Sequence, residues 1–150
     1  MRLFTAALPP ADVADHLEAA LADVPMRYRV AREAWHITLG YYGEEDPDGR
    51  IPWVRAKARG LTRPTVALGD MSNFGETLLM RVDNQDGALA ALGMTLRWND
   101  KHPDYNPHLT IGKGELVSLG YAGPEWTISE IVLLGAEERH EYTVLDKVTL

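Results

Sequence analysis

The sequence contains one short phrase twice, as AWHITLG at Ala34–Gly40 and as NPHLTIG at Asn106–Gly112. In each copy a histidine is followed by an apolar residue, a threonine, a second apolar residue and a glycine. Successive side chains of a β-strand point to opposite faces, so the histidine and the threonine of each copy share one face. The apolar residues share the other face, where they can anchor the strand in a core. The repeat therefore predicts two equivalent strands that present their His-Thr pairs to one cleft.

The two copies occupy matched places in a longer pattern, because a strand and then a helix are expected before each of them. The whole pattern predicts strands at 2–8, 26–30, 35–42, 65–68, 77–82, 108–112, 126–134 and 142–148, helices at 11–22, 51–59 and 87–98, and a solvated acidic loop at 44–49. No linker rich in Pro, Gly or Ser divides the halves. We therefore predict one α+β domain spanning 1–150, whose two pseudo-symmetric lobes, 1–62 and 63–150, share a core and are not independent.

The composition narrows the class of protein. A chain of 150 residues with 45% apolar residues can bury the core of a single domain. It has no apolar run of about 18 residues, and its first ten residues read as a strand ended by two prolines, so we expect neither a membrane span nor a signal peptide. The absence of cysteine excludes disulfides and a cysteine nucleophile, and it fits a cytoplasmic protein. A net charge of −7 argues against a large nucleic-acid-binding surface but permits a small phosphate ligand.

The four repeated polar residues suit acid-base chemistry on a phosphodiester. Histidine titrates near neutral pH, so of His36 and His108 one can take a proton while the other gives one. The hydroxyls of Thr38 and Thr110 can hold the non-bridging oxygens as negative charge builds up on them. This scheme needs no metal and no cofactor. A single His-x-Thr is common in strands, and it is the matched pair that favours the catalytic interpretation.

At these motifs the sequence resembles the 2H phosphoesterases, particularly the branch called 2′-5′ RNA ligases or RNA 2′,3′-cyclic phosphodiesterases. Their mark is a pair of His-x-Thr/Ser-x motifs, matched here by His36–Leu39 and His108–Ile111. The resemblance extends to the opening Arg2-Leu3-Phe4, to Gly43-Glu44 and to a late Tyr142. It implies a bilobal fold with two antiparallel sheets around a central cleft and helices outside. It also implies that His36 and His108 are the acid-base pair, that Thr38 and Thr110 bind phosphate, and that a 2′,3′-cyclic phosphate is opened to a 2′-phosphate.

Further residues are candidates for substrate binding. The branch commonly has an arginine five residues after the second motif histidine, and this chain has Lys113 there, a charge without the two-pronged geometry of arginine. Phe4 is a candidate for stacking on a nucleobase, with a core position as the alternative. Tyr42 shares the face of His36 if the strand stays regular, and Tyr105 precedes the second motif in a loop that can border the cleft.

Alternatives to the first interpretation remain open at this stage. The first interpretation expects a nucleotide, an oligonucleotide or an RNA end that bears a cyclic phosphate as the substrate. Two alternatives keep the same chemistry: a cyclic or 2′-5′-linked oligonucleotide signal, and a cyclic phosphate of ADP-ribose. A protein of another class would bind a phosphorylated nucleotide without turning it over. A metal site built from His102, Asp104 and His108 is the main rival for the histidines, although their spacing matches no strong motif. We expect a monomer.

Overall fold

A computed structural model describes residues 1–84, 86–98, 105–138 and 141–150. Its elements follow the order β1 (Arg2–Ala7), α1 (Ala11–Leu21), β2 (Tyr28–Arg29), the short 3-10 helix η1 (Arg32–Ala34), β3 (Ile37–Glu44), α2 (Pro47–Ala58), β4 (Thr65–Phe74), β5 (Thr77–Asp83), α3 (Ala88–Leu96), β6 (His108–Lys113), β7 (Trp126–Thr127), β8 (Glu130–Ala136) and β9 (Tyr142–Thr149). The predicted α+β class is confirmed.

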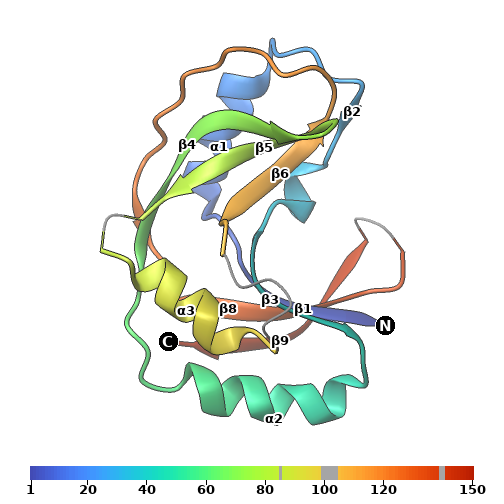
Figure 1. The fold of residues 1–150 in the computed structure, drawn as a ribbon, viewed down its shortest axis with the longest axis vertical. Coiled ribbons are helices and arrows are strands. Elements are labelled where there is room, and N and C mark those ends of the chain that lie inside the picture. Colours follow the sequence, from blue (N-terminus) through green and yellow to red (C-terminus); the bar gives the residue numbers. More distant parts are fainter. Residues whose placement is uncertain (85, 99–104, 139–140) are drawn as a thin grey trace.

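The strands form two groups that meet at one point (Figure 1). Their order along the sheet is β7-β4-β5-β6-β3-β1-β8-β9, with β2 beside β6, and all of these pairings are antiparallel. The junction lies between β6 and β3, where Ile37 pairs with Leu109. These are the central apolar residues of the two repeated motifs, so the motifs themselves join the two groups.

Each half of the chain uses the same local plan around its motif. In the first half β1 lies antiparallel to β3 and Ala7 pairs with Ile37. In the second half β5 lies antiparallel to β6 and Met80 pairs with Leu109. A helix connects the two strands of each pair, α1 in the first and α3 in the second. The predicted order of strand, helix and motif strand is therefore confirmed in both halves.

A β-bulge follows the threonine in each motif strand. The pairing with β1 skips Leu39, and the pairing with β5 skips Ile111. The glycine after each bulge is required by close approach of another segment. A Cβ at Gly40 would lie 2.3 Å from the Leu96 carbonyl oxygen, and a Cβ at Gly112 would lie 2.2 Å from the Tyr28 carbonyl oxygen. The glycine of the repeated phrase thus allows a backbone to pack on each bulge.

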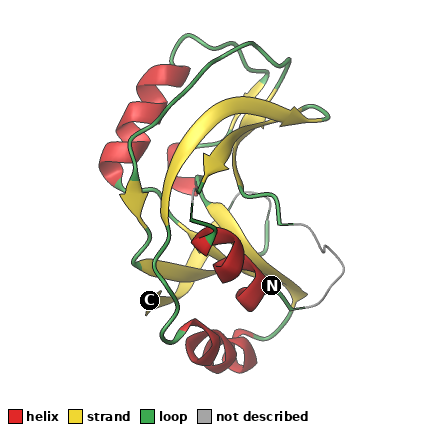
Figure 2. Ribbon diagram, turned by 60° about the vertical axis from the view of Figure 1, so that its left-hand side comes forward, coloured by secondary structure: helices red, strands yellow, loops and turns green. Residues whose placement is uncertain are grey.

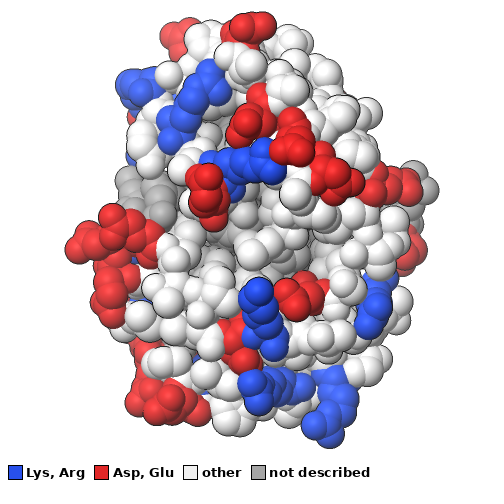
Figure 3. Space-filling model, turned by 180° about the vertical axis from the view of Figure 1, so that it is seen from behind, with Lys and Arg blue, Asp and Glu red and all other residues white. Residues whose placement is uncertain are grey.

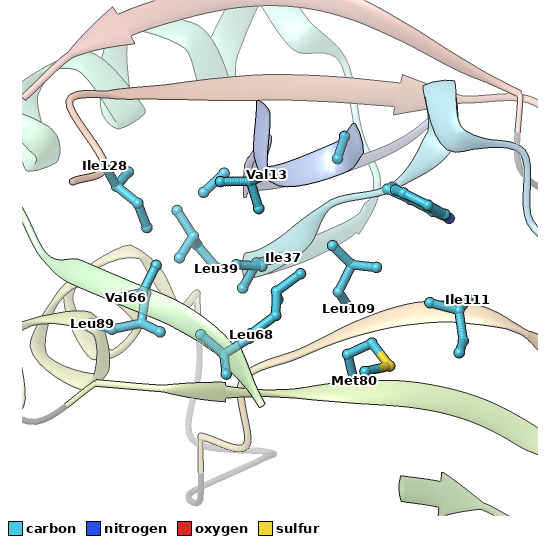
Figure 4. Close-up of a cluster of buried hydrophobic side chains, with 14 of the residues drawn as sticks. Val13, Ile37, Leu39, Val66, Leu68, Met80, Leu89, Leu109, Ile111 and Ile128 are labelled. Atoms are coloured by element: carbon cyan, nitrogen blue, oxygen red, sulfur yellow. The ribbon is translucent and has the colours of Figure 1, made fainter. Parts of the chain in front are cut away.

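The core continues from one strand group into the other through the junction. Ile37 and Leu109 are fully buried, and they lie close to Leu68 and Met80 of the β4–β6 group and to Val13 of α1 (Figure 4). Burial of side chains of this size stabilises the fold by about 1.5–3 kcal/mol each. The two groups of strands therefore share one core.

The lobes do not follow the halves of the sequence. Strands β8 and β9 from the end of the chain pair with β1, so the β3-β1-β8-β9 group contains strands from both 1–62 and 63–150. The predicted boundary between lobes at residue 62 is therefore wrong. The predicted strand at 126–134 is also two strands, because β7 pairs with β4 while β8 pairs with β1.

The helices lie outside the strands (Figure 2). Helix α1 covers the β4–β6 group, whereas α2 contacts α3 and β9, and α3 also contacts β3. Helix α2 begins at Pro47, earlier than predicted, because Asp46 caps it by accepting a hydrogen bond from the Asp48 amide at 2.9 Å. The interpretation of 44–49 as a loop of solvated charges is therefore wrong at its second half.

None of the described helices is long and apolar enough to span a membrane. On the face shown in Figure 3, Lys and Arg side chains are interspersed with Asp and Glu. The face shown therefore offers little continuous positive charge to a nucleic-acid backbone.

The bulge glycines give a direct test of this packing. We expect Gly40→Ala and Gly112→Ala each to lower the free energy of unfolding by about 1–3 kcal/mol, because the new methyl group meets a backbone carbonyl that cannot rotate away. Urea unfolding at pH 7 measures the loss. Gly49→Ala in α2 is the matched control, since its Cβ meets nothing within 4 Å and alanine is the better helix former. Equal stability of the Gly40 and Gly49 variants would contradict the close approach.

Candidate active site

The pairing of Ile37 with Leu109 arranges the four motif residues around the junction. Continued by one residue to either side, this antiparallel register places His36 opposite Thr110 and Thr38 opposite His108. The two apolar residues point into the core, so the four polar side chains belong to the other face. His36, Thr38 and Thr110 are half-buried, and His108 is exposed. The register brings both predicted His-Thr pairs to one place.

Both imidazoles are held in the same way. The Nδ1 atom of His36 lies 2.8 Å from the carbonyl oxygen of Ala34, and the Nδ1 atom of His108 lies 2.8 Å from that of Asn106. A carbonyl oxygen can only accept, so each Nδ1 carries a proton. The nitrogen of each ring that changes its protonation state is therefore Nε2. The residue two positions before each histidine thus sets its tautomer and its orientation.

Two cavities flank the junction. The larger, of about 480 Å³, is lined by Thr38, Tyr41, Trp98, Tyr105 and His108, among others. The smaller, of about 240 Å³, is lined by Arg2, Phe4, His36, Thr38, Tyr41, Ala136 and Tyr142. Thr38 and Tyr41 line both cavities. A ligand whose phosphate lies at the motifs therefore has room on either side of the phosphorus atom.

The bulge in β3 changes which tyrosine faces the site. Tyr41 pairs with Phe4, two residues before the Ala6 that pairs with Thr38, so Tyr41 is the residue that shares the face of Thr38. Tyr41 is 57% exposed, whereas Tyr42 is 7% exposed and belongs to the core. The prediction that Tyr42 shares the face of His36 is therefore wrong, because the strand is not regular. Tyr42 is nevertheless among the residues that line the larger cavity.

The Tyr42 hydroxyl takes part in a buried network. It donates to the Leu96 carbonyl oxygen at 2.8 Å and lies 3.1 Å from the hydroxyl oxygen of Thr5. Thr5 in turn accepts a hydrogen bond from the Gly40 amide at 3.0 Å. This network links the bulge to the end of α3. Burial raises the pKa of Tyr42 to about 12.

Lys113 is brought to the site face by the second bulge. It pairs with Thr77. Thr77, Leu79 and Arg81 are every second residue of β5, so their side chains share one face. Because Leu79 pairs with Thr110, Lys113 lies on the same face as Thr110. Without the bulge Lys113 would point the other way. Lys113 and Tyr41 thus occupy equivalent positions, each five residues after a motif histidine.

The aromatic candidates both lie close to the motifs. Phe4 is 7% exposed, and its ring lies 5.1 Å from that of His36 and 5.3 Å from that of Tyr142. Tyr105 donates from its hydroxyl to the Thr38 carbonyl oxygen at 2.8 Å, and burial raises its pKa. Phe4 therefore packs beside a motif histidine, and Tyr105 borders the cleft.

Sequence reasoning missed Tyr41 and Trp98, and named Tyr142 only through the family resemblance. The single signal for Tyr41 was its place next to a repeated glycine, and nothing marked Trp98. Among the residues that the structure describes, no group of three His, Asp or Glu residues is placed to hold a metal ion. His102 and Asp104 of the rival metal site lie outside the described residues.

The buried tyrosine generates a test at alkaline pH. Its raised pKa means that Tyr42 contributes stability that is complete below about pH 10 and is lost as the pH rises towards 12. We expect Tyr42→Phe to be about 1–3 kcal/mol less stable at pH 8, because the Leu96 carbonyl and Thr5 lose their partner. Between pH 10 and 12 the variant should lose stability less steeply than the unmodified protein. Urea unfolding across this range, with the exposed Tyr41→Phe as control, measures both effects; parallel curves would contradict the role of Tyr42.

Solved structures with this fold match nearly the whole chain. The crystal structure of TT0787 of Thermus thermophilus has a TM-score of 0.79 at 21% sequence identity, covering 100% of this chain and 98% of that one. E. coli LigT complexed with NADP+ has a TM-score of 0.82 at 21% identity, with 99% and 96% covered. A structure described as a phosphoesterase has a TM-score of 0.81 at 20% identity, with 99% and 97% covered.

Sequence comparison adds nothing to this likeness, since no family model and no curated protein matches the chain. The likeness in structure is nevertheless complete from end to end. The chain therefore has the fold of E. coli LigT, as the resemblance of its two His-x-Thr motifs to the 2H phosphoesterases implied.

Proposed function

We propose that this protein is a metal-independent phosphodiesterase that opens a 2′,3′-cyclic phosphate to a 2′-phosphate. The observation that carries the proposal is the matched placement of His36 and His108 on either side of the Ile37–Leu109 pair. Each ring donates from Nδ1 to a backbone carbonyl oxygen at 2.8 Å. Two equivalent imidazoles with Nε2 as the reactive nitrogen suit a reaction that needs one base and one acid.

In the proposed reaction one histidine is neutral and the other is charged. The neutral Nε2 takes a proton from water while the water oxygen forms a bond to phosphorus. The bond from phosphorus to the ribose 3′ oxygen breaks, and this oxygen takes the proton from the charged Nε2. One proton is thus taken and one is given, so solvent exchange restores the starting states. Either histidine can serve as the base, depending on how the substrate lies.

The threonines and the lysine support this scheme by stabilising negative charge. The hydroxyls of Thr38 and Thr110 lie on the face of the histidines and can donate to the two non-bridging oxygens. Lys113 reaches the same face through the bulge in β6 and adds positive charge on the side of Thr110. As a point charge it attracts the phosphate without the two-pronged contact of an arginine.

The ligands of the structural neighbour favour a nucleotide as the substrate. Crystal structures of E. coli LigT contain ATP, NADP+, 3′-AMP and phosphate. The net charge of −7 favours a small soluble substrate over a long RNA. The same chemistry applies to a cyclic or 2′-5′-linked oligonucleotide and to a cyclic phosphate of ADP-ribose. A substrate panel separates these possibilities, and tight binding without turnover would indicate the nucleotide-binding module.

The first test is turnover by histidine variants. The purified protein is incubated with the four 2′,3′-cyclic nucleotides in EDTA, and the product is identified as a 2′- or 3′-phosphate. We expect a 2′-phosphate, and a loss of at least about 100-fold in kcat for His36→Ala and for His108→Ala. His16→Ala is the control, since His16 bonds Tyr121 away from the motifs. Turnover that survives in either motif variant would refute the acid-base assignment.

The pH dependence tests the roles of the pair. Because one histidine must be neutral and the other charged, kcat/KM should follow a bell-shaped pH profile. EDTA should leave this profile unchanged. A rate that rises continuously into alkali, or one that EDTA abolishes and added metal restores, would favour metal-assisted hydrolysis instead.

A further inference from the structure

Trp98 forms part of the wall of the larger cavity. It follows α3, is 54% exposed, and lines the 480 Å³ cavity together with Thr38 and His108 of the motifs. The exposed part of this ring offers a flat apolar surface on which another ring can stack. Its position beside the proposed reaction centre gives that surface access to a ligand.

A buried arginine supports the ring of Trp98 from behind. The guanidinium carbon of Arg50 lies 4.2 Å from the centroid of the Trp98 ring, 4.7 Å from that of Trp53 and 4.4 Å from that of Tyr42. Trp53 also meets Trp98 edge to face at 6.0 Å. One face of Trp98 is thus covered by a cation, so its exposed area belongs to the opposite face and the edges.

The guanidinium is itself fixed. Arg50 is only 6% exposed, and it donates from Nε and Nη2 to the two carboxylate oxygens of Glu45 at 2.7 and 2.6 Å. The same contact lowers the pKa of Glu45, so the carboxylate stays charged at neutral pH. A planar guanidinium held by a two-pronged ion pair and by three rings has little freedom to turn. It therefore holds Trp98 in one orientation.

We propose that Trp98 determines specificity by stacking on the nucleobase of the substrate, and that Arg50 is its positioning residue. The inference rests on the proposed function and adds the part of the substrate that the larger cavity recognises. The cavity lies next to His108, so a nucleotide whose phosphate is at the motifs can reach Trp98 with its base. Purines offer more stacking area than pyrimidines and should bind more tightly.

The kinetic test compares substrates with and without a base. The substrates are adenosine 2′,3′-cyclic phosphate, cytidine 2′,3′-cyclic phosphate and the 2′,3′-cyclic phosphate of 1-O-methylribose. We expect Trp98→Ala to raise KM on the order of 10- to 100-fold for the adenosine substrate and less for the cytidine substrate. KM for the base-free substrate and kcat for all three should stay within about threefold.

Matched variants separate stacking from general damage. Trp126→Phe is the control, because Trp126 lies in β7 and lines a different cavity. Arg50→Lys keeps the charge but loses the two-pronged contact, so it should raise the same KM by a smaller factor and alter the fluorescence of the protein. Glu45→Gln serves this purpose if Arg50→Lys does not fold. An unchanged KM in Trp98→Ala, or an equal rise for the base-free substrate, would overturn the inference.

Equilibrium binding keeps this test independent of turnover. We expect 2′-AMP to quench the tryptophan fluorescence of the protein, and Trp98→Phe to remove most of this quenching. If no cyclic phosphate is hydrolysed but 2′-AMP quenches Trp98, the proposed reaction fails and the stacking site stands. If hydrolysis occurs and the quenching is the same in Trp98→Phe, the stacking site fails and the proposed reaction stands.

Discussion

The antiparallel pair of Ile37 and Leu109 is the contact on which the rest of the structure depends. It joins two groups of strands that otherwise diverge, and it continues the core from one group into the other. The same contact decides which side chains surround the junction. A slip of one residue would pair Ile37 with His108 or Thr110, so one motif would turn its histidine and threonine into the core and its apolar residues towards solvent. Stability and the proposed chemistry therefore rely on the same two residues.

The two bulges that follow the motifs are equivalent in backbone, but the side chains that they turn towards the site differ. Each bulge brings the fifth residue after the histidine onto the face of the site, and these residues are Tyr41 on one side and Lys113 on the other. An aromatic ring and a cation thus occupy positions that the pseudo-two-fold makes equivalent. The backbone repeats, and the side chains at its variable positions distinguish the two sides of a bound phosphate. Such a site can bind its ligand in one preferred direction.

Two arginines of α2 form ion pairs with nearby carboxylates in this acidic protein. Arg50 is buried with Glu45 among three aromatic rings, where its desolvation is offset by a two-pronged ion pair and by ring contacts. Arg55 and Asp146 form a comparable two-pronged pair between α2 and β9. These contacts hold α2 against β9 and against the ring of Trp98. The positive charges of these two arginines are therefore neutralised by neighbouring carboxylates and offer little attraction to a polyanion.

The sequence by itself determined most of the elements, the repeat and the shared face of the histidine and threonine in each motif, because alternation along a strand and periodicity along a helix are local properties of the chain. It also determined that the halves share one plan. The tertiary structure decided what depends on distant segments: the bulge that turns Tyr41 outward in place of Tyr42, where Gly40 meets the Leu96 carbonyl, and the division of 126–134 between two partner strands. Trp98 gained its place from contacts with Arg50 and Trp53, which lie far from it in the sequence. No local pattern encodes such contacts, because they arise only when the packed chain brings separate backbones and rings together.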